Sequence, residues 1–264
     1  IFLVKVSIGV SSAYLRQSDP GLTPQVFAPG TISIAGAIDY GGTFSPDGTE
    51  FYFTRRMVDS DNQNIYETHL ANGIWSEPAP VSFSAGYNAY EPHVTADNNT
   101  LYFGWFRPPP SGEESMMPAG IWATDRTVDG WSVPRYVGEG MFVSSDKSGQ
   151  IYVTNMSTHP PSLNKVSLTE DGRFTNFETI SAGVHPAIAP DGSYLVYDDG
   201  DGHFQVKFFL EDGTWGPSLK LTTQGIPASA SIASISPDGK YLFYADNQDL
   251  YWVSTTLILN LKED

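Results

Sequence analysis

Apolar residues in this chain occur in short alternating segments, each preceded by a turn of small residues. Phe44-Ser45-Pro46-Asp47-Gly48 precedes Phe51-Tyr52-Phe53, and three other segments repeat this order. They are Val94-Thr95-Ala96-Asp97-Asn98 before Leu101-Tyr102-Phe103, Ile188-Ala189-Pro190-Asp191-Gly192 before Tyr194-Leu195-Val196-Tyr197, and Ile235-Ser236-Pro237-Asp238-Gly239 before Tyr241-Leu242-Phe243-Tyr244. A fifth, degenerate copy is Val143-Ser144-Ser145-Asp146-Lys147-Ser148-Gly149 before Ile151-Tyr152-Val153. Because Pro, Asp and Gly favour turns, and β-branched and aromatic residues favour strands, each copy predicts two antiparallel strands.

The copies recur with a near-constant period, since their aspartates lie 45 to 50 residues apart. A third strand is expected in each unit, over residues 65–68, 120–123, 165–167, 205–208 and 250–253. A Trp-x-x-Pro motif or a relative of it follows, as at Trp75 and Trp131, and then a short extended segment. A unit of this length with four antiparallel strands has the size of one β-propeller blade. We therefore predict an all-β, five-bladed β-propeller of four-stranded antiparallel blades.

The ring is expected to close between the two ends of the chain. The fifth unit stops after its third strand, near Ser254, and the segment Pro24–Gly30 has the composition of a fourth strand. Pairing this N-terminal segment with the last blade removes two open sheet edges. The prediction is an N-terminal segment (1–21) and a single propeller domain (22–264), with a sixth blade from residues 1–20 and 255–264 as the alternative.

The Ser-Pro-Asp-Gly-x-x-Phe/Leu-Tyr-Phe boxes resemble the WD40-like (PD40/TolB-type) repeats of bacterial envelope propellers. The resemblance covers about residues 22–254. Related propellers occur beside the catalytic domain of prolyl oligopeptidase-like peptidases and in oligogalacturonate lyase. The resemblance implies a blade architecture and leaves the function open, because the repeat encodes a blade and not a site.

Charge and composition restrict the partners and the compartment. The chain carries 14 Lys and Arg against 30 Asp and Glu, a formal charge of −16, which argues against nucleic acid as a partner. No apolar run is long enough to span a membrane. Cysteine is absent, and residues 1–13 are apolar and end in Ser11-Ser12-Ala13, like the remnant of a signal peptide, although an ordinary edge strand fits equally well. We expect a periplasmic or secreted protein, with the cytoplasm as the alternative.

Candidate site residues come from the inner-strand starts and from the loops between second and third strands, which should share the face around the channel mouth. The set is Asp39, Tyr40, Arg55, Arg56, Tyr90, Glu91, His93, Trp105, Arg107, Glu139, Asn155, His159, His185, Asp198 and His203. With Tyr87 they form a cupped polar site with aromatic walls, suited to a small molecule, a carbohydrate or a protein. The turn aspartates should lie on the opposite face and only form turns.

Other interpretations of these residues stay open. Arg55 and Arg56 can pair with nearby acids on a solvated loop, and His93 can pack between blades. The acidic run 198–202 fits a solvated turn better than a calcium site. The proline-rich loop 106–119 can be a lid or a decoration.

The alternative function is a carbohydrate-active enzyme with its site in the central channel. In a glycoside hydrolase, Asp39, Glu91 and Glu139 would converge. In a polysaccharide lyase, His93, His159, His185 and Glu91 would hold a divalent metal, and Arg55 or Arg107 would bind the substrate carboxylate. No Gly-x-Ser-x-Gly motif supports a peptidase.

Overall fold

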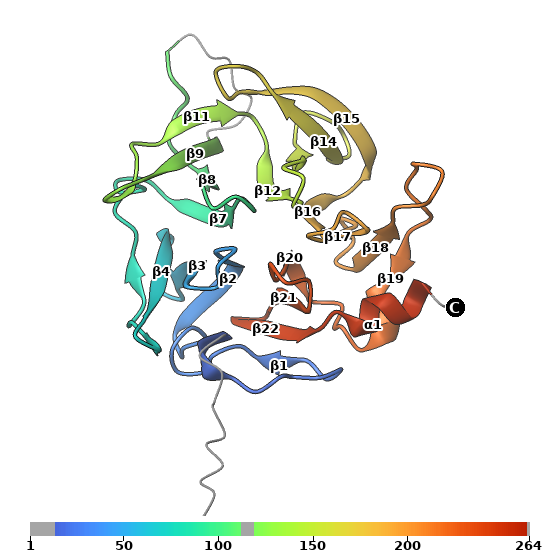
Figure 1. Ribbon diagram of the computed structural model, residues 1–264, viewed down its shortest axis with the longest axis horizontal. Coiled ribbons are helices and arrows are strands. Elements are labelled where there is room, and N and C mark those ends of the chain that lie inside the picture. Colours follow the sequence, from blue (N-terminus) through green and yellow to red (C-terminus); the bar gives the residue numbers. More distant parts are fainter. Residues whose placement is uncertain (1–13, 112–118, 263–264) are drawn as a thin grey trace, which may run out of the picture.

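The repeats form five antiparallel sheets around a central axis in the computed structural model, which describes residues 14–111 and 119–262 (Figure 1). Blade 1 consists of β2 (Ala37–Phe44), β3 (Glu50–Met57), β4 (Gln63–Ala71), β5 (Ile74–Trp75) and β6 (Ala79–Pro80). Blade 2 consists of β7 (Ala89–Val94), β8 (Thr100–Trp105), β9 (Gly120–Thr127), β10 (Gly130–Trp131) and β11 (Arg135–Gly138). Blade 3 contains β12 (Met141–Ser145), β13 (Ile151–Asn155), β14 (Ser162–Leu168) and β15 (Phe174–Ala182). Blade 4 contains β16 (Val184–Ile188), β17 (Tyr194–Asp198), β18 (Phe204–Phe208) and β19 (Leu219–Lys220).

Blade 5 combines the two ends of the chain. It consists of β20 (Ser231–Ile235), β21 (Tyr241–Asp246), β22 (Asp249–Ser254) and, at its outer edge, β1 (Gln25–Val26). Gln25 pairs with Trp252 and Val26 with Tyr251, which confirms the predicted closure. In blades 1 and 2 the fourth strand is split into two short pieces that pair with the same third strand.

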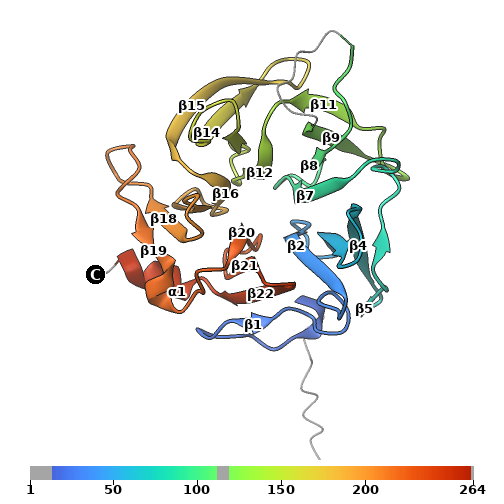
Figure 2. The same cartoon turned by 180° about the vertical axis from the view of Figure 1, so that it is seen from behind.

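Short helices lie before, between and after the strands of the ring. The turn η1 (Tyr14–Arg16) begins the described chain, and η2 (Leu221–Gln224) follows blade 4. After blade 5 the chain forms α1 (Thr256–Leu259) and η3 (Asn260–Lys262) in place of further strands (Figure 2). Leu257 and Ile258 of α1 are buried against blades 4 and 5, so the described part of 255–264 belongs to no sixth blade.

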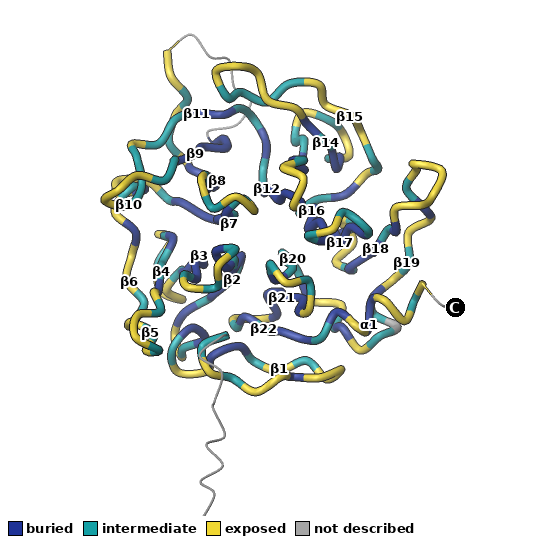
Figure 3. The backbone as a smooth tube through the Cα atoms, in the orientation of Figure 1, coloured by how far each residue is buried: buried dark blue, intermediate teal, exposed yellow. Residues whose placement is uncertain are grey.

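Burial decreases from the axis outward, as Figure 3 shows for the inner strands and the outer edges. At the junction of blades 5 and 1, Phe27 from the N-terminal segment is fully buried among Phe51, Phe243 and Trp252, with ring centroids 5.0–5.4 Å away. Edge-to-face aromatic packing of this kind adds to the hydrophobic gain of closure. The pairing of β1 and the burial of Phe27 together hold the ring shut.

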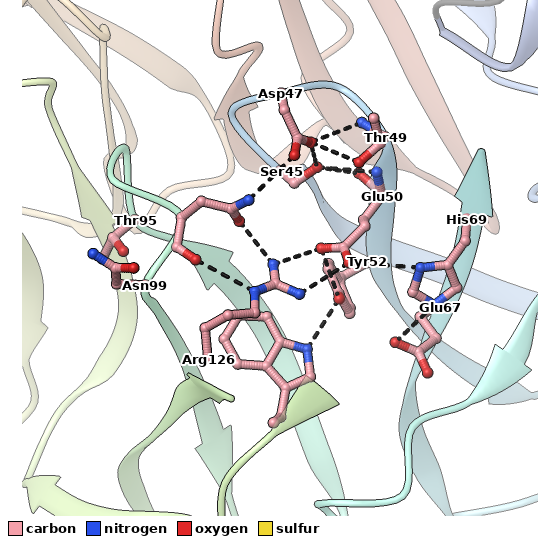
Figure 4. Close-up of polar contacts among 12 residues, drawn as sticks. Ser45, Asp47, Thr49, Glu50, Tyr52, Glu67, His69, Thr95, Asn99 and Arg126 are labelled. Carbon is pink, nitrogen blue, oxygen red and sulfur yellow. Dashed lines mark hydrogen bonds and ion pairs between the residues drawn. The ribbon is translucent and has the colours of Figure 1, made fainter. Parts of the chain in front are cut away.

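Blades 1 and 2 are joined near the turns by an ionic network (Figure 4). Arg126 donates to both carboxylate oxygens of Glu50, at 2.9 and 2.6 Å, and its guanidinium lies 3.9 Å from the ring centroid of Trp131. His69 lies between the carboxylates of Glu50 and Glu67. Hydrogen bonds that His69 donates to Glu50 and to Glu67 raise its pKa to about 9, although partial burial opposes the shift. The network stabilises the junction, and none of its members was a candidate site residue.

Hydrogen bonds within the turns explain the regular aspartates. The Oδ1 atom of Asp47 accepts hydrogen bonds from Thr49 N, at 3.0 Å, and from the Ser45 and Thr49 hydroxyls. The equivalent aspartates 97, 191 and 238 each accept from the backbone N–H two residues later and from one nearby hydroxyl, so their predicted role as turn formers is confirmed. In blade 3 the turn is one residue shorter, because Asp146 N bonds to Gln150 O, whereas Ser45 N bonds to Glu50 O. Asp146 therefore corresponds to Ser45 and not, as the sequence repeat suggested, to Asp47.

Candidate functional site

All five inner strands bulge at the same position. The bulge residues have left-handed backbones, with φ between 53° and 58°: Gly41, Glu91, Phe142, His185 and Ile232. Glycine is the residue that usually takes this conformation, and only in blade 1 is the bulge residue a glycine. A residue of L configuration held there is strained, and the surrounding structure must compensate for that strain. We call these five residues the bulge ring.

Hydrogen bonds from the preceding blade support three of the bulges. Thr54 Oγ1 accepts from Glu91 N at 2.8 Å, and Thr154 Oγ1 accepts from His185 N at 2.9 Å. In blade 4, Asp198 occupies the position on the second strand that Thr54 and Thr154 occupy in blades 1 and 3. Its Oδ2 accepts from Ile232 N at 3.3 Å. These bonds satisfy backbone donors that the bulges remove from the strand ladder.

Side chains of the bulge ring meet at the axis. His185 Nε2 lies 3.6 Å from Glu91 Oε1, although the two residues belong to blades 2 and 4, and the His185 ring lies edge-to-face on Phe142, with centroids 5.6 Å apart. The other ring nitrogen, Nδ1, is hydrogen-bonded to Asp198 Oδ2. The structure therefore brings together three predicted site residues, Glu91, His185 and Asp198, from distant parts of the sequence.

This cluster contains two carboxylates for one imidazole. Burial raises the pKa of Glu91, while the charge of His185 opposes that shift. Burial acts to lower the pKa of His185, but the charge of Glu91 and the hydrogen bond to Asp198 outweigh it and raise the pKa. Glu91 Oε2 and Asp198 Oδ1 are buried without a partner among the described residues. The cluster therefore places one imidazole between two buried carboxylates at the axis of the ring.

A cavity of about 400 Å³ lies on the other side of the bulge ring, toward the turns. Gly41 and Phe142 line its inner end, and residues of the five turns line its mouth: Pro46, Ala96, Lys147, Pro190 and Pro237. Its walls combine apolar and polar residues: Phe44, Val94, Ile188 and Ile235 occupy equivalent positions of four inner strands, and Thr43, His93, Ala187 and Ser234 precede them. The sequence predicted a site on the opposite face, so this cavity has a different position from the expected one.

His93 is the candidate residue that lines this cavity. Its Nε2 atom is 2.8 Å from Ser145 Oγ across the seam between blades 2 and 3. Burial lowers the pKa of His93 to about 4, so its ring is neutral at pH 7. Two further lining hydroxyls are already engaged, since Ser144 donates to Pro186 O and Ser234 to Gly42 O of the neighbouring blades. The cavity thus combines apolar walls with a neutral imidazole.

Arg55 and Asp39 are placed apart from the axial cluster. Arg55 Nε donates to Asp39 Oδ1 at 2.7 Å, and its Nη2 donates to the carbonyl oxygen of Ile32. Both side chains are buried, at 8% and 0% exposure. Burial raises the pKa of Asp39 to about 6, although Arg55 acts to lower it. This pair joins blade 1 to the N-terminal segment, so the expected shared site of Arg55 with Glu91 and His185 does not form.

The remaining candidates make local contacts. The hydroxyl of Tyr40 donates to Gln63 at 2.6 Å, Arg56 donates to Ser60 O, and Tyr90 is buried. Arg107 lies 5.0 and 4.9 Å from the ring centroids of Trp105 and Trp122, in a groove at the outer part of blade 2. Glu139 accepts a hydrogen bond from Ser157 Oγ, and Asn155 accepts one from Ser157 N. His159 is exposed, and His203 Nδ1 lies 3.8 Å from Asp199 Oδ2. Residues 112–118 of the predicted loop lie outside the described residues.

The residues that each enzyme alternative requires do not share one site in this arrangement. Asp39, Glu91 and Glu139 have different partners, namely Arg55, His185 and Ser157. In residues 14–111 and 119–262, no group of three or more His, Asp or Glu side chains has the arrangement of a metal site. The same part of the chain contains no helix long and apolar enough to cross a membrane.

Sequence reasoning did not assign a ligand-binding role to the other polar residues that line the cavity, which are Thr43, Ser144, Ser145, Lys147, Ser234 and Asp238. Thr43 and Ser234 directly precede a repeat copy, and the others lie within a copy whose residues were interpreted as purely structural. Aligning the five copies shows that Ser145 replaces an apolar residue found in the other four blades. That substitution is the signal in the sequence.

Comparisons with known proteins agree with the architecture. No protein-family model matches the chain, and no curated protein sequence matches it. The structure of TolB from Acinetobacter baumannii is similar, with a TM-score of 0.51 and 14% identity over 82% of this chain and 54% of that one. The tricorn protease gives 0.50 and 14% over 81% and 21%, and a gluconolactonase from Xanthomonas campestris gives 0.49 and 13% over 85% and 88%. The chain spans about half of the TolB chain, and at these identities the likeness is one of fold: this protein is a five-bladed β-propeller.

Proposed function

We propose that this protein binds a small molecule in the central cavity between its turns. The cavity volume, about 400 Å³, carries the proposal, because pockets for small ligands typically measure roughly 300–1,000 Å³. The walls come from all five inner strands, so the site exists before the ligand arrives and binding requires little ordering. The repeats, which resemble those of envelope propellers, support a TolB-type protein that works outside the cytoplasm.

Apolar surface is expected to supply most of the affinity. The mouth prolines and Ile235 offer rigid or apolar surface to a ligand. His93 is neutral at pH 7 and can accept or donate one hydrogen bond through Nδ1, which has no partner among the described residues. An apolar molecule with one polar group fits this lining.

Titration with N-phenyl-1-naphthylamine, a neutral fluorescent probe, tests the proposal. The wild-type protein should bind it saturably with one site, and Thr43→Phe, which fills the cavity from β2, should weaken binding at least tenfold. Ala96→Trp places a large side chain at the exposed mouth and should give the same loss without disturbing the core. The matched control is Thr127→Phe, on the exposed end of β9. Binding that is absent in the wild type, or unchanged in both cavity variants, contradicts the proposal.

A further inference from the structure

We propose that the natural ligand of the cavity is a small amine, with a positively charged group at the mouth and an apolar body inside. The inference rests on the proposed function and adds the sign of the ligand's charge. The cavity itself is the site, and the groups around its mouth decide which charge it accepts.

Aspartates surround the mouth in every blade. Each lies next to a residue that lines the cavity: Asp47 after Pro46, Asp97 after Ala96, Asp146 before Lys147, Asp191 after Pro190 and Asp238 after Pro237. Four of them are held ionised by their own turns. For Asp97, the hydrogen bond from the Thr95 hydroxyl is the main cause of a lowered pKa. For Asp47, Asp191 and Asp238, partial burial acts in the opposite direction, but hydrogen bonds within the turn outweigh it and lower the pKa.

Two lysines offset this charge only in part. Lys240 Nζ lies 3.2 Å from Asp238 Oδ2 and is paired with it. Lys147 lines the mouth and forms no ion pair with the described residues, although its charge helps to lower the pKa of Asp191. Five aspartates and two lysines leave the turns of the mouth with a charge of −3. The whole chain, at −16, adds a field of the same sign.

Contacts between neighbouring turns fix these charges in place. Asn98 Nδ2 donates to Asp47 Oδ2 at 3.3 Å, from blade 2 to blade 1. Lys147 N donates to Pro190 O at 2.8 Å, from blade 3 to blade 4. An ammonium group therefore meets attraction at the rim of the cavity, whereas a carboxylate meets repulsion there.

The experiment compares three ligands that share one ring system: 1-naphthylmethylamine, naphthalene-1-methanol and 1-naphthoate, each competing with N-phenyl-1-naphthylamine. We expect the affinity to fall in that order. The ratio of amine to carboxylate affinity should shrink when salt is raised from 0.05 to 0.5 M, because the rim charges are exposed and screened. The neutral alcohol tests the cavity alone. If the alcohol does not bind, the proposed function is overturned. Alcohol binding without a preference for the amine overturns only the present inference.

Charge-removing variants locate the preference. A unit charge roughly 8 Å away in water changes affinity by about twofold. Asp97→Asn with Asp191→Asn should therefore weaken the amine about fourfold and strengthen the carboxylate about fourfold, which lowers their ratio about sixteenfold. The control is Asp212→Asn, which removes a charge from a turn at the outer part of blade 4. Asp212 accepts from the backbone N–H and the hydroxyl of Thr214, as Asp191 does from those of Ser193. Lys147→Gln should raise the ratio. An equal change of the ratio in the control, or none in the double variant, contradicts the inference.

Discussion

The axial cluster gives the sharpest prediction about stability. In His185→Leu the apolar side chain keeps most of the packing on Phe142 but leaves the carboxylates of Glu91 and Asp198 without their cation. Removing one partner of a buried ion pair costs about 3–5 kcal/mol. We expect that loss at pH 7, because Glu91 is 5% and Asp198 6% exposed, and little water reaches them.

The pH dependence separates charge from packing. The pKa of Glu91 is raised in the fold, so its folded carboxyl is largely protonated at pH 4.5 and needs no cation there. The pKa of His185 is also raised, so its stabilisation is complete below about pH 6.5 and is lost as the pH rises through the higher folded value. The part of the deficit that comes from the Glu91 charge is therefore mostly absent at pH 4.5, whereas the part that comes from protonated His185 and Asp198 remains. The deficit of His185→Leu should be smaller at pH 4.5 than at pH 7 without vanishing.

Urea unfolding at the two pH values, followed by tryptophan fluorescence, measures these deficits. The matched control is Thr154→Val, which removes the hydrogen bond to His185 N and should cost about 1 kcal/mol at both pH values. A deficit for His185→Leu that equals the control, or one that does not change with pH, would refute the reasoning about the buried charges.

Three further outcomes follow from the fold. His69→Gln should destabilise the protein by less than about 1 kcal/mol below pH 6.5 and not above pH 9, measured by urea unfolding, because the pKa of His69 is raised to about 9 and the residue is half-exposed. Gly104→Ala places a Cβ 2.4 Å from the Tyr90 ring and should cost about 1–3 kcal/mol in thermal unfolding, against about 0.5 for Gly138→Ala, whose new Cβ lies 3.4 Å from its nearest neighbour. Deletion of residues 14–36 removes β1 and should abolish cooperative unfolding in calorimetry; a normal transition would contradict the closure.

The sequence predicts the blades because each depends on local chemistry. Turn residues such as Asp47 bond within their own loop, and the strand after them alternates, so the period is visible in one dimension. Closure was also predictable, because a blade that lacks a strand leaves an open edge. The shorter turn at Asp146 was not predicted from the sequence, because a serine and an aspartate can cap the same backbone groups.

The contacts at the axis depend on features that the sequence does not display. A bulge adds one residue and changes which side chains face the channel, so alternation cannot be followed across Glu91 or His185. His93, two residues after Glu91, faces the cavity on the turn side and contacts Ser145, whereas Glu91 contacts His185. The pair of Arg55 with Asp39 was not predicted either, because alternation along each strand does not show which residues of two neighbouring strands lie opposite each other.

Histidine resonances can identify the ligand-binding face in one experiment. The chain has five histidines, and His93 alone among the described ones lines the cavity, while His185 lies at the bulge ring and His159 is exposed. Imidazole proton spectra recorded during titration with 1-naphthylmethylamine should show a saturable shift of the His93 signals, with those of His159 unmoved. A shift at His159 or His203 with His93 unchanged would place binding elsewhere and contradict the account.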